Sequence, residues 1–276
     1  MKKLLRTIMY AILYVGGGYL ALIVILYILQ DRLLYHPSAH FSGTPSAIQA
    51  EWKDVYFESV DGLRLHGWYL PHEESEYAVL FSHGNGGNIS DRLQLLDWMN
   101  ESRISVFIYD YRGYGKSEGT PTEKGLYQDI EAAWRYLTRD QSYDPSQIIL
   151  FGRSLGGPVS AYLGQNVDAG GLVLESTFTR LKDIASEAYP MIPSRLVRPK
   201  FPTLDYLSQS SAPVMVMHSR EDPLIGFQHA RKLYEKAPEP KTFVELWGGH
   251  NNNFVESQEV YFRAWKEFIA NLETEM

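Results

Sequence analysis

A serine flanked by glycines is the first feature of this chain whose setting predicts chemistry. The segment Gly152-Arg153-Ser154-Leu155-Gly156 has the spacing G-x-S-x-G and directly follows the apolar run 148–151. A sharp turn from a strand into a helix would hold the Ser154 hydroxyl above the end of that strand, and glycines leave room for such a turn. We therefore expect Ser154 to act as a nucleophile.

A serine hydroxyl needs a general base, and the base needs an acid that orients it. In chains with this motif the order is serine, then an acid, then histidine. Asp222 lies in the loop after the apolar run 214–217, and His250 lies after the run 242–247. We expect His250 to be the general base and then the general acid. Asp222 would fix its tautomer and stabilise the imidazolium.

Other acidic and histidine residues compete for these roles. Glu175 ends the preceding apolar run and Glu221 adjoins Asp222, so either is an alternative acid. His218 lies within or at the end of a predicted strand, where we expect a hydrogen-bonded core residue. His229 lies in the middle of a predicted helix, where we expect a surface position.

The tetrahedral intermediate of acyl transfer needs hydrogen-bond donors aimed at its oxyanion. The backbone N–H of Leu155, which follows the nucleophile, is one candidate donor. The loop His83-Gly84-Asn85-Gly86-Gly87-Asn88 follows an earlier apolar run, and we expect its Asn85 N–H to be the second donor. A glycine-rich loop can also cradle phosphate, but this one lacks G-K-[ST] and G-x-G-x-x-G. His83 is expected to be a structural hydrogen-bonding residue.

Short apolar runs that alternate with longer amphipathic stretches predict the elements that position these residues. A hairpin around Asp61-Gly62 opens the pattern. Strand–helix alternation of this kind indicates an α/β fold with a mostly parallel sheet, covered on both faces, and an antiparallel opening hairpin. The expected strands are 55–59, 63–70, 78–82, 105–109, 148–152, 172–174, 214–218 and 242–246, and the expected helices include 88–100, 122–138, 155–165 and 226–236.

The segment 176–211 departs from this alternation. It contains four prolines and has no clear periodicity, so we interpret it as an inserted cap over the edge of the sheet. The segment 110–117 follows a predicted strand and has the glycines of a tight loop. Arg112 within it is expected to hold that turn, with substrate contact as the alternative.

The N-terminal segment has a different composition from the rest. The 24 residues Thr7–Gln30 carry no charge. As a helix they would extend roughly 36 Å, which exceeds a hydrocarbon core of about 30 Å. The run stays bulky to its end, unlike a cleaved signal peptide. We expect an uncleaved membrane anchor that contacts the lipid bilayer through residues 7–30.

Charges beside the apolar run predict its orientation. Lys2, Lys3 and Arg6 precede it, whereas Arg32 is the only Lys or Arg among the 20 residues that follow. The positive-inside rule then places the N-terminus in the cytoplasm and the catalytic domain outside, which is the periplasm in a bacterium. We expect a tip and anchor at 1–30, a juxtamembrane connection at 31–50 and one domain at 51–276.

Composition narrows the function classes. The chain has 276 residues, a formal net charge of −7 and no cysteine. Without cysteine there are no disulfides, thiolate metal sites or cysteine nucleophile. The acidic balance argues against nucleic-acid binding. With 45% hydrophobic and 21% charged residues, the composition is that of a globular protein.

Residues 78–276 resemble the α/β-hydrolase superfamily of serine hydrolases. The resemblance rests on H-G-x at His83, on D-Y-R-G-Y-G-x-S at 110–117, and on Ser154, Asp222 and His250. The loop at 83–89 and the N-terminal anchor resemble the single-pass, membrane-anchored α/β-hydrolase-domain proteins. The resemblance implies an eight-stranded sheet and no metal or organic cofactor. Arg153 stands where His, Tyr or Asp is more usual, which would alter the charge near the nucleophile.

Three functions follow from these expectations. The first is hydrolysis of small-molecule carboxylic esters or thioesters through an acyl-enzyme, with lipid or acyl substrates that the cap at 176–211 would help to bind. The second is peptide hydrolysis by the same residues, for which Glu175 and Glu187 could recognise an amine. The third is a catalytically silent, membrane-tethered binding module. Such modules usually lose a member of the triad, and here all three residue types are present.

Overall fold

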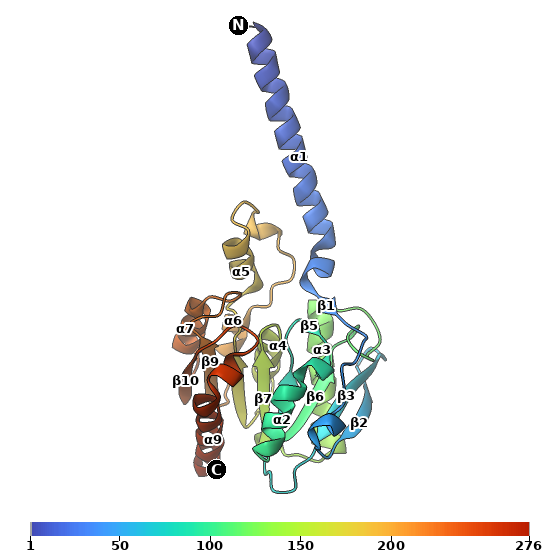
Figure 1. Ribbon diagram of the computed structural model, residues 1–276, viewed down its shortest axis with the longest axis vertical. Coiled ribbons are helices and arrows are strands. Elements are labelled where there is room, and N and C mark those ends of the chain that lie inside the picture. Colours follow the sequence, from blue (N-terminus) through green and yellow to red (C-terminus); the bar gives the residue numbers. More distant parts are fainter. Residues whose placement is uncertain (1, 276) are drawn as a thin grey trace.

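One sheet carries the core of the chain in the computed structural model, which describes residues 2–275 (Figure 1). It has eight strands in the order β10-β9-β8-β7-β4-β6-β3-β2. Their bounds are β2 Lys53–Glu58, β3 Arg64–Leu70, β4 Ala78–Ser82, β6 Ser105–Asp110, β7 Ile148–Arg153, β8 Gly171–Glu175, β9 Val214–Ser219 and β10 Lys241–Leu246. β3 pairs antiparallel with β2 and β6, and the other neighbours pair parallel. The predicted mostly parallel, eight-stranded sheet is confirmed.

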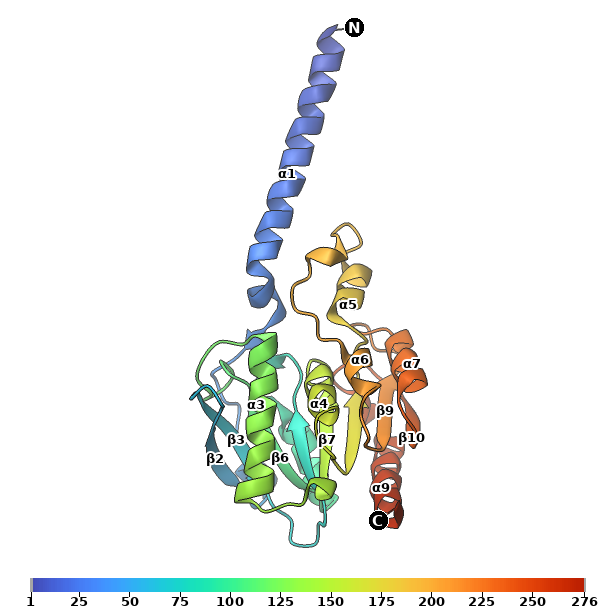
Figure 2. The same cartoon turned by 180° about the vertical axis from the view of Figure 1, so that it is seen from behind.

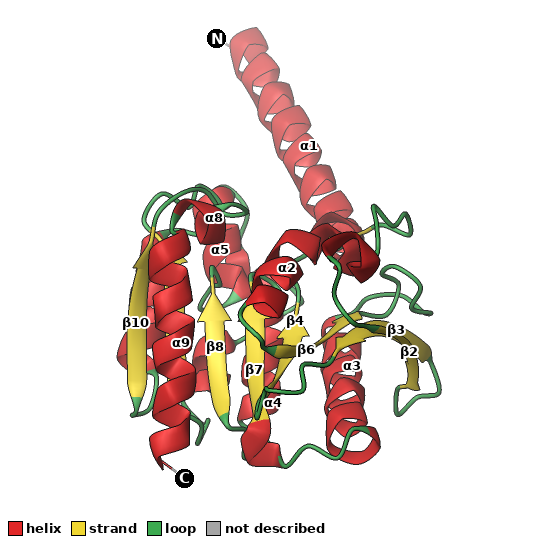
Figure 3. Ribbon diagram, turned by 60° about the horizontal axis from the view of Figure 1, so that its bottom comes forward, coloured by secondary structure: helices red, strands yellow, loops and turns green. Residues whose placement is uncertain are grey.

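Helices cover both faces of this sheet. Figure 2 shows α3, α4 and α7 on one face, and Figure 3 shows α2 and α9 on the other. Successive strand residues alternate between the two layers, so Phe107 packs toward α3 and Ile108 toward α2. The helices are α2 Leu93–Glu101, α3 Glu123–Arg135, α4 Gly156–Gly164, α5 Leu181–Ala188, α6 Thr203–Leu207, α7 Phe227–Lys236, α8 Asn253–Glu256 and α9 Gln258–Glu275.

Short helical turns connect or extend these elements. They are the 3₁₀ turns η1 Pro45–Ile48, η2 Ile89–Arg92, η4 Pro145–Gln147 and η5 Ser194–Leu196, and the π turn η3 Tyr136–Asp140. α3 begins at Glu123 because the Thr122 hydroxyl accepts the N–H of Gly125. Together, α3 and η3 cover the predicted helix at 122–138.

The C-terminal helix α9 was not among the helices expected from the sequence. Tyr261, Trp265, Phe268 and Leu272 are buried at spacings of three and four residues, and they close one face of the sheet. This spacing is the signal that identifies a helix with one apolar face. α9 therefore completes the layer that α2 begins.

The helix α1, Lys2–Leu34, projects away from the sheet (Figure 1). None of its described residues is buried. It is the one helix among residues 2–275 that is long and apolar enough to cross a membrane, since an 18-residue window within it has a mean hydropathy of 2.3. Directly after it, β1 His36–Pro37 pairs parallel with β5 Gly86–Gly87, which lies in the predicted oxyanion loop. The end of the helix is thereby joined to that loop.

The predicted cap segment divides into two parts. α5 and η5 stand at the same end of the molecule as α1 (Figure 2). The later part folds onto the sheet layer, where α6 packs against α4 and α7. Phe201 and Leu207 of this part are buried in the core that includes α3 and α4. The part that stands above the sheet therefore centres on residues 181–199.

Candidate active site

Ser154 lies on a tight turn between β7 and α4. Its φ of 53° is in the left-handed region, which is strained for a residue with a side chain and typical of functional turns. The Ser154 N–H donates to the Glu175 carbonyl at 2.9 Å, and the Thr177 hydroxyl donates to the Ser154 carbonyl at 2.7 Å. The segment around the end of β8 therefore holds both peptide groups of the turn.

The glycines after Ser154 are required by close packing. A Cβ on Gly156 would lie 1.9 Å from the Ser82 carbonyl oxygen, and a Cβ on Gly157 would lie 2.1 Å from the Thr177 hydroxyl oxygen. Both distances are far below van der Waals contact. Gly156 of the motif and Gly157 after it therefore let α4 begin directly against the end of β4 and the segment that follows β8.

Ser154, His250 and Asp222 come together beyond the carboxyl ends of the parallel strands. His250 Nε2 lies 3.0 Å from Ser154 Oγ, and His250 Nδ1 lies 2.7 Å from Asp222 Oδ2. The three residues follow β7, β10 and β9, so the strand order brings the last two to neighbouring loops. Each distance is that of a hydrogen bond.

The environment of Asp222 keeps its carboxylate ionised. Its other oxygen accepts the backbone N–H of Leu224 at 2.9 Å and of Ile225 at 3.0 Å. Burial alone would raise the pKa of the Asp222 carboxyl. The hydrogen bond and charge of His250, with the two N–H groups, instead hold this pKa below its ordinary value. A negative charge therefore faces His250 Nδ1.

The alternative acids are engaged elsewhere. Glu175 Oε2 accepts the Tyr261 hydroxyl at 2.7 Å, and Glu221 accepts the N–H of Gly248 at 2.9 Å. His218 is buried in β9, as expected, and its Nε2 lies 2.8 Å from the Ile225 carbonyl. Both glutamates thus have structural partners.

The expected surface position of His229 is wrong. His229 is fully buried in α7, where its Nδ1 accepts the N–H of Thr179 at 3.2 Å and its Nε2 lies 3.2 Å from Glu187. The cap segment crosses this face of α7 and covers the imidazole. The sequence periodicity of α7 cannot predict that contact, because the contact depends on how the cap folds back over the helix.

The predicted oxyanion loop lies directly beside Ser154. A Cβ on Gly84 would be 3.4 Å from Ser154 Cβ. The Asn85 side chain is held on both sides, because its Nδ2 donates to the Leu34 carbonyl and its Oδ1 accepts the Tyr114 hydroxyl at 3.1 Å. The loop therefore packs against Ser154 at Gly84 and is fixed at Asn85. Leu155 is buried next to Ser154.

His83 has the structural setting that we expected. It is fully buried, and its Nδ1 lies 2.7 Å from the Gly84 carbonyl oxygen. Burial, with the nearby charge of Arg92, lowers the pKa of His83 to about 3, so the ring stays neutral. With Nδ1 protonated, this histidine donates to the loop that borders Ser154.

The Arg112 side chain anchors the loop 110–117 to neighbouring segments of the chain. Its guanidinium donates to Asp129 at 2.8 Å and to Asp61 at 2.8 Å, and the side chain is buried. This agrees with a structural role for the loop. Among residues 2–275, no three His, Asp, Glu or Cys side chains are arranged to hold a metal ion.

Comparison with known proteins places these motifs in a family. Residues 73–210 match the family described as serine aminopeptidase, S33. The α/β hydrolase domain-containing protein WAV2 of Arabidopsis thaliana is 32% identical over an alignment of 282 positions, which spans 92% of each chain. The chain belongs to the α/β-hydrolase family. An uncharacterised protein of Mycobacterium tuberculosis is 36% identical over 245 residues, or 87% of each chain.

Solved structures agree with the fold of this α/β-hydrolase. The esterase Pf2001 of Pyrococcus furiosus superposes with a TM-score of 0.73 at 20% identity, over 86% of this chain and 97% of the esterase. An α/β hydrolase of Vibrio vulnificus gives a TM-score of 0.65 at 24% identity, over 83% of each chain. Both similarities concern the fold.

In this α/β-hydrolase the unusual Arg153 supports the loop that carries the histidine. Its Nε lies 3.0 Å from Glu175 Oε1, and its Nη2 donates to the His250 carbonyl at 2.8 Å and to Asn253 Oδ1 at 3.1 Å. The expectation concerned only the charge that Arg153 would bring near the nucleophile. In the structure the buried Glu175 carboxylate pairs with that charge. The sequence does carry a signal for this ion pair, namely an arginine directly before the serine and an acid at the end of the next strand.

Proposed function

We propose that this α/β-hydrolase is a membrane-anchored serine hydrolase that cleaves carboxylic esters or thioesters. The observation that carries the proposal is the hydrogen-bonded series from Ser154 Oγ through His250 to Asp222, with distances of 3.0 and 2.7 Å. A serine beside an imidazole that a carboxylate orients is the arrangement that activates a hydroxyl for attack on a carbonyl carbon.

The reaction would proceed through an acyl-enzyme. His250 Nε2 accepts the proton of Ser154 as Oγ attacks the substrate carbonyl, and the backbone N–H groups of Leu155 and Asn85 hold the resulting oxyanion. His250 then gives the proton to the leaving alcohol or thiol. His250 then takes a proton from a water molecule as that water attacks the acyl carbonyl, and it gives the proton to Ser154 Oγ as the acyl–oxygen bond breaks and the carboxylic acid leaves. Throughout, Asp222 stabilises the imidazolium.

The anchor in this proposal is α1. Its apolar run is long enough for a bilayer, and three basic residues precede it. The positive-inside rule favours an N-terminus in the cytoplasm and a catalytic domain on the opposite side. The enzyme would therefore act at a membrane surface.

The test is labelling and hydrolysis by the full-length protein in detergent micelles. We expect a fluorophosphonate probe to label the wild type and p-nitrophenyl esters to be hydrolysed. Ser154→Ala should abolish labelling and lower kcat by at least about 10³-fold. Ser186→Ala is the matched control, because Ser186 is exposed on α5, and it should retain both activities. Labelling that persists in Ser154→Ala would remove Ser154 from its role.

Peptide hydrolysis is a second candidate, favoured by the description of the matching family as serine aminopeptidases. The same residues would then protonate an amine leaving group. Glu175 is buried and paired with Arg153, whereas Glu187 on α5 contacts His229 with one oxygen and its side chain is 47% exposed, so Glu187 would be the acid that meets a substrate amine. Parallel assays with aminoacyl arylamides and acyl esters separate the two candidates. A large arylamide preference would favour the peptidase.

A further inference from the structure

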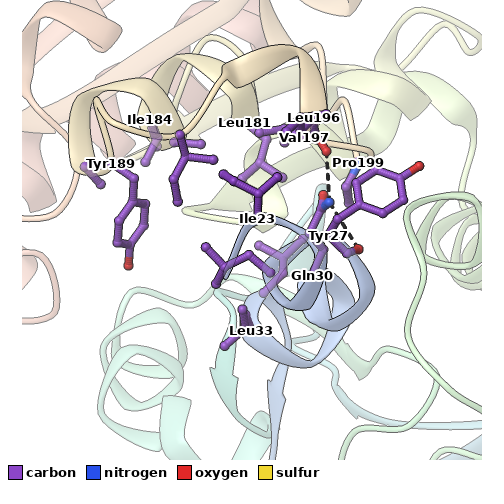
Figure 4. Close-up of a pocket in the computed structure, with 15 residues that line it drawn as sticks. Ile23, Tyr27, Gln30, Leu33, Leu181, Ile184, Tyr189, Leu196, Val197 and Pro199 are labelled. Atoms are coloured by element: carbon purple, nitrogen blue, oxygen red, sulfur yellow. Dashed lines mark hydrogen bonds between the residues drawn. The ribbon is translucent and has the colours of Figure 1, made fainter. Parts of the chain in front are cut away.

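A groove lies between the end of α1 and the cap (Figure 4). Its volume is about 370 Å³, within the range of small-molecule sites. α1 contributes Ile23, Leu26 and Leu33, and the cap contributes Ile184, Ala185 and Leu196. None of the described residues that line it is charged, and Gln30 is its one side-chain amide. The interior is therefore suited to an apolar ligand.

Polar contacts hold the two walls together. Gln30 Nε2 donates to the Leu196 carbonyl at 2.9 Å, and Gln30 Oε1 accepts the N–H of Arg198 at 2.7 Å. The Arg198 guanidinium also lies 3.2 Å from the Asp31 carboxylate. Further along the helix, the Tyr19 hydroxyl donates to the Met191 carbonyl at 2.5 Å. These contacts hold α1 and the cap in place as the two walls of one groove with an apolar interior.

The position of the groove connects it with a bilayer. Tyr19 lies about 16 Å above Gln30 along the helix axis, and both belong to the uncharged run 7–30. Met191 contacts Tyr19 and is 77% exposed, and Tyr189 beside it is 62% exposed. If α1 crosses the membrane, this apolar tip of the cap reaches the acyl-chain region of one leaflet. The groove then opens toward lipid.

One residue at the inner end of the groove contacts the predicted oxyanion loop. Leu34 lines the groove, and its carbonyl accepts the Asn85 side-chain amide. Asn85 follows Gly84, which packs against Ser154. The groove and Ser154 are therefore separated by Leu34 and the oxyanion loop, and an acyl chain in the groove would extend past Leu34 to place its carbonyl at Ser154.

We propose that the helix–cap groove binds the acyl chain of a membrane lipid ester, with the anchor helix itself as one wall of the substrate site. This proposal rests on the proposed function. A water-sized group fills about 30 Å³ of liquid, so the groove accommodates roughly a dozen methylene-sized groups. That space fits a single chain and is smaller than one turn of a helix from a second copy, which fills roughly 400 Å³ at about 10 Å across and 5.4 Å of pitch. The anchor thus contributes to substrate selection as well as to localisation.

The test compares chain-length selectivity in the full-length protein, reconstituted in phosphatidylcholine vesicles. The probes are p-nitrophenyl acetate and p-nitrophenyl laurate, and the readout is the ratio of their kcat/KM values. Ala185→Trp fills the groove from α5, and Leu26→Trp fills it from α1. Each should lower the laurate-to-acetate ratio by at least about tenfold, because the acyl chain loses its place.

Matched variants control for the added indole. Ser186→Trp places it on the exposed side of α5, and Leu20→Trp places it on an exposed position of α1 outside the groove. Both should keep the wild-type ratio. Fluorophosphonate labelling of Ser154 at the wild-type rate in every variant verifies that the site is folded.

Three results would overturn the proposal. The first is an unchanged ratio in both groove variants, and the second is an equal fall in the ratio in the controls. The third is a change of oligomeric mass in the groove variants alone, which would indicate a second copy as the occupant. A wild-type protein that hydrolyses neither ester and is not labelled would instead refute the proposed function.

Discussion

Arg153→Met should destabilise the folded protein strongly, because it leaves the Glu175 carboxylate buried without its cation. The Glu175 side chain is fully buried, and that of Arg153 is 7% exposed, so water cannot replace the lost partner. Breaking such a buried pair costs about 3–5 kcal/mol. The Tyr261 hydroxyl stays on Glu175 and limits the cost. The lost hydrogen bonds to His250 and Asn253 each add about 1 kcal/mol.

A double-mutant cycle tests this explanation. Glu175→Gln removes the buried negative charge, so adding it to Arg153→Met should recover much of the lost stability, with a coupling energy of at least about 1 kcal/mol. The assay is urea unfolding in detergent micelles, followed by tryptophan fluorescence. Hydrolysis of p-nitrophenyl acetate should also fall in Arg153→Met, because the carbonyl of His250 loses its donor.

An exposed ion pair supplies the control. Arg220 donates to Glu245 at 2.8 Å, and the Arg220 side chain is 58% exposed. Arg220→Met should therefore change the free energy of unfolding by less than about 1 kcal/mol. If Arg153→Met costs no more than this control, or if the double variant is no more stable than Arg153→Met, the buried-charge explanation is refuted.

Three further predictions test the turn, the acid and the buried histidine. Gly156→Ala should lower the free energy of unfolding by about 1–3 kcal/mol, because its Cβ would clash with the Ser82 carbonyl. Gly86→Ala has open space around its Cβ and should change the free energy of unfolding by less than about 0.5 kcal/mol. Urea unfolding measures both variants. Asp222→Asn should lower kcat for p-nitrophenyl esters by about 10³–10⁴-fold with the fold intact, because the imidazole loses its orienting charge, and a loss under tenfold would contradict that role. Burial keeps the pKa of His83 at about 3, so below pH about 6.5 the unfolded chain binds a proton that the folded protein does not. The free energy of unfolding should therefore fall with decreasing pH by up to about 1.4 kcal/mol per unit from this residue, and unfolding curves of His83→Asn between pH 6.5 and 4.5 should show a correspondingly smaller slope.

Local patterns in the sequence were enough to predict the sheet and the positions of the candidate catalytic residues at the ends of its strands. Six strands appear as short apolar runs, which is typical of parallel strands buried on both faces, and the opening hairpin appears as alternation around Asp61-Gly62. Ser154, Asp222 and His250 each follow such a run, and strand ends of a parallel sheet share one edge. The apolar length of α1 was also evident from composition. These features depend on residues that are close together in the chain.

Other features were decided only when distant segments packed together. The Gln30 side chain and the Leu196 carbonyl are 166 residues apart, and Arg153 and the His250 carbonyl are 97 residues apart. The burial of His229 likewise depends on the cap that covers α7. No local periodicity records such contacts, because each arises from how side chains of separate elements fit once the chain has folded. The sequence by itself thus determined the strands and the order of Ser154, Asp222 and His250 along the chain. The tertiary structure decided which side chains support these three residues, and it formed the groove between α1 and the cap.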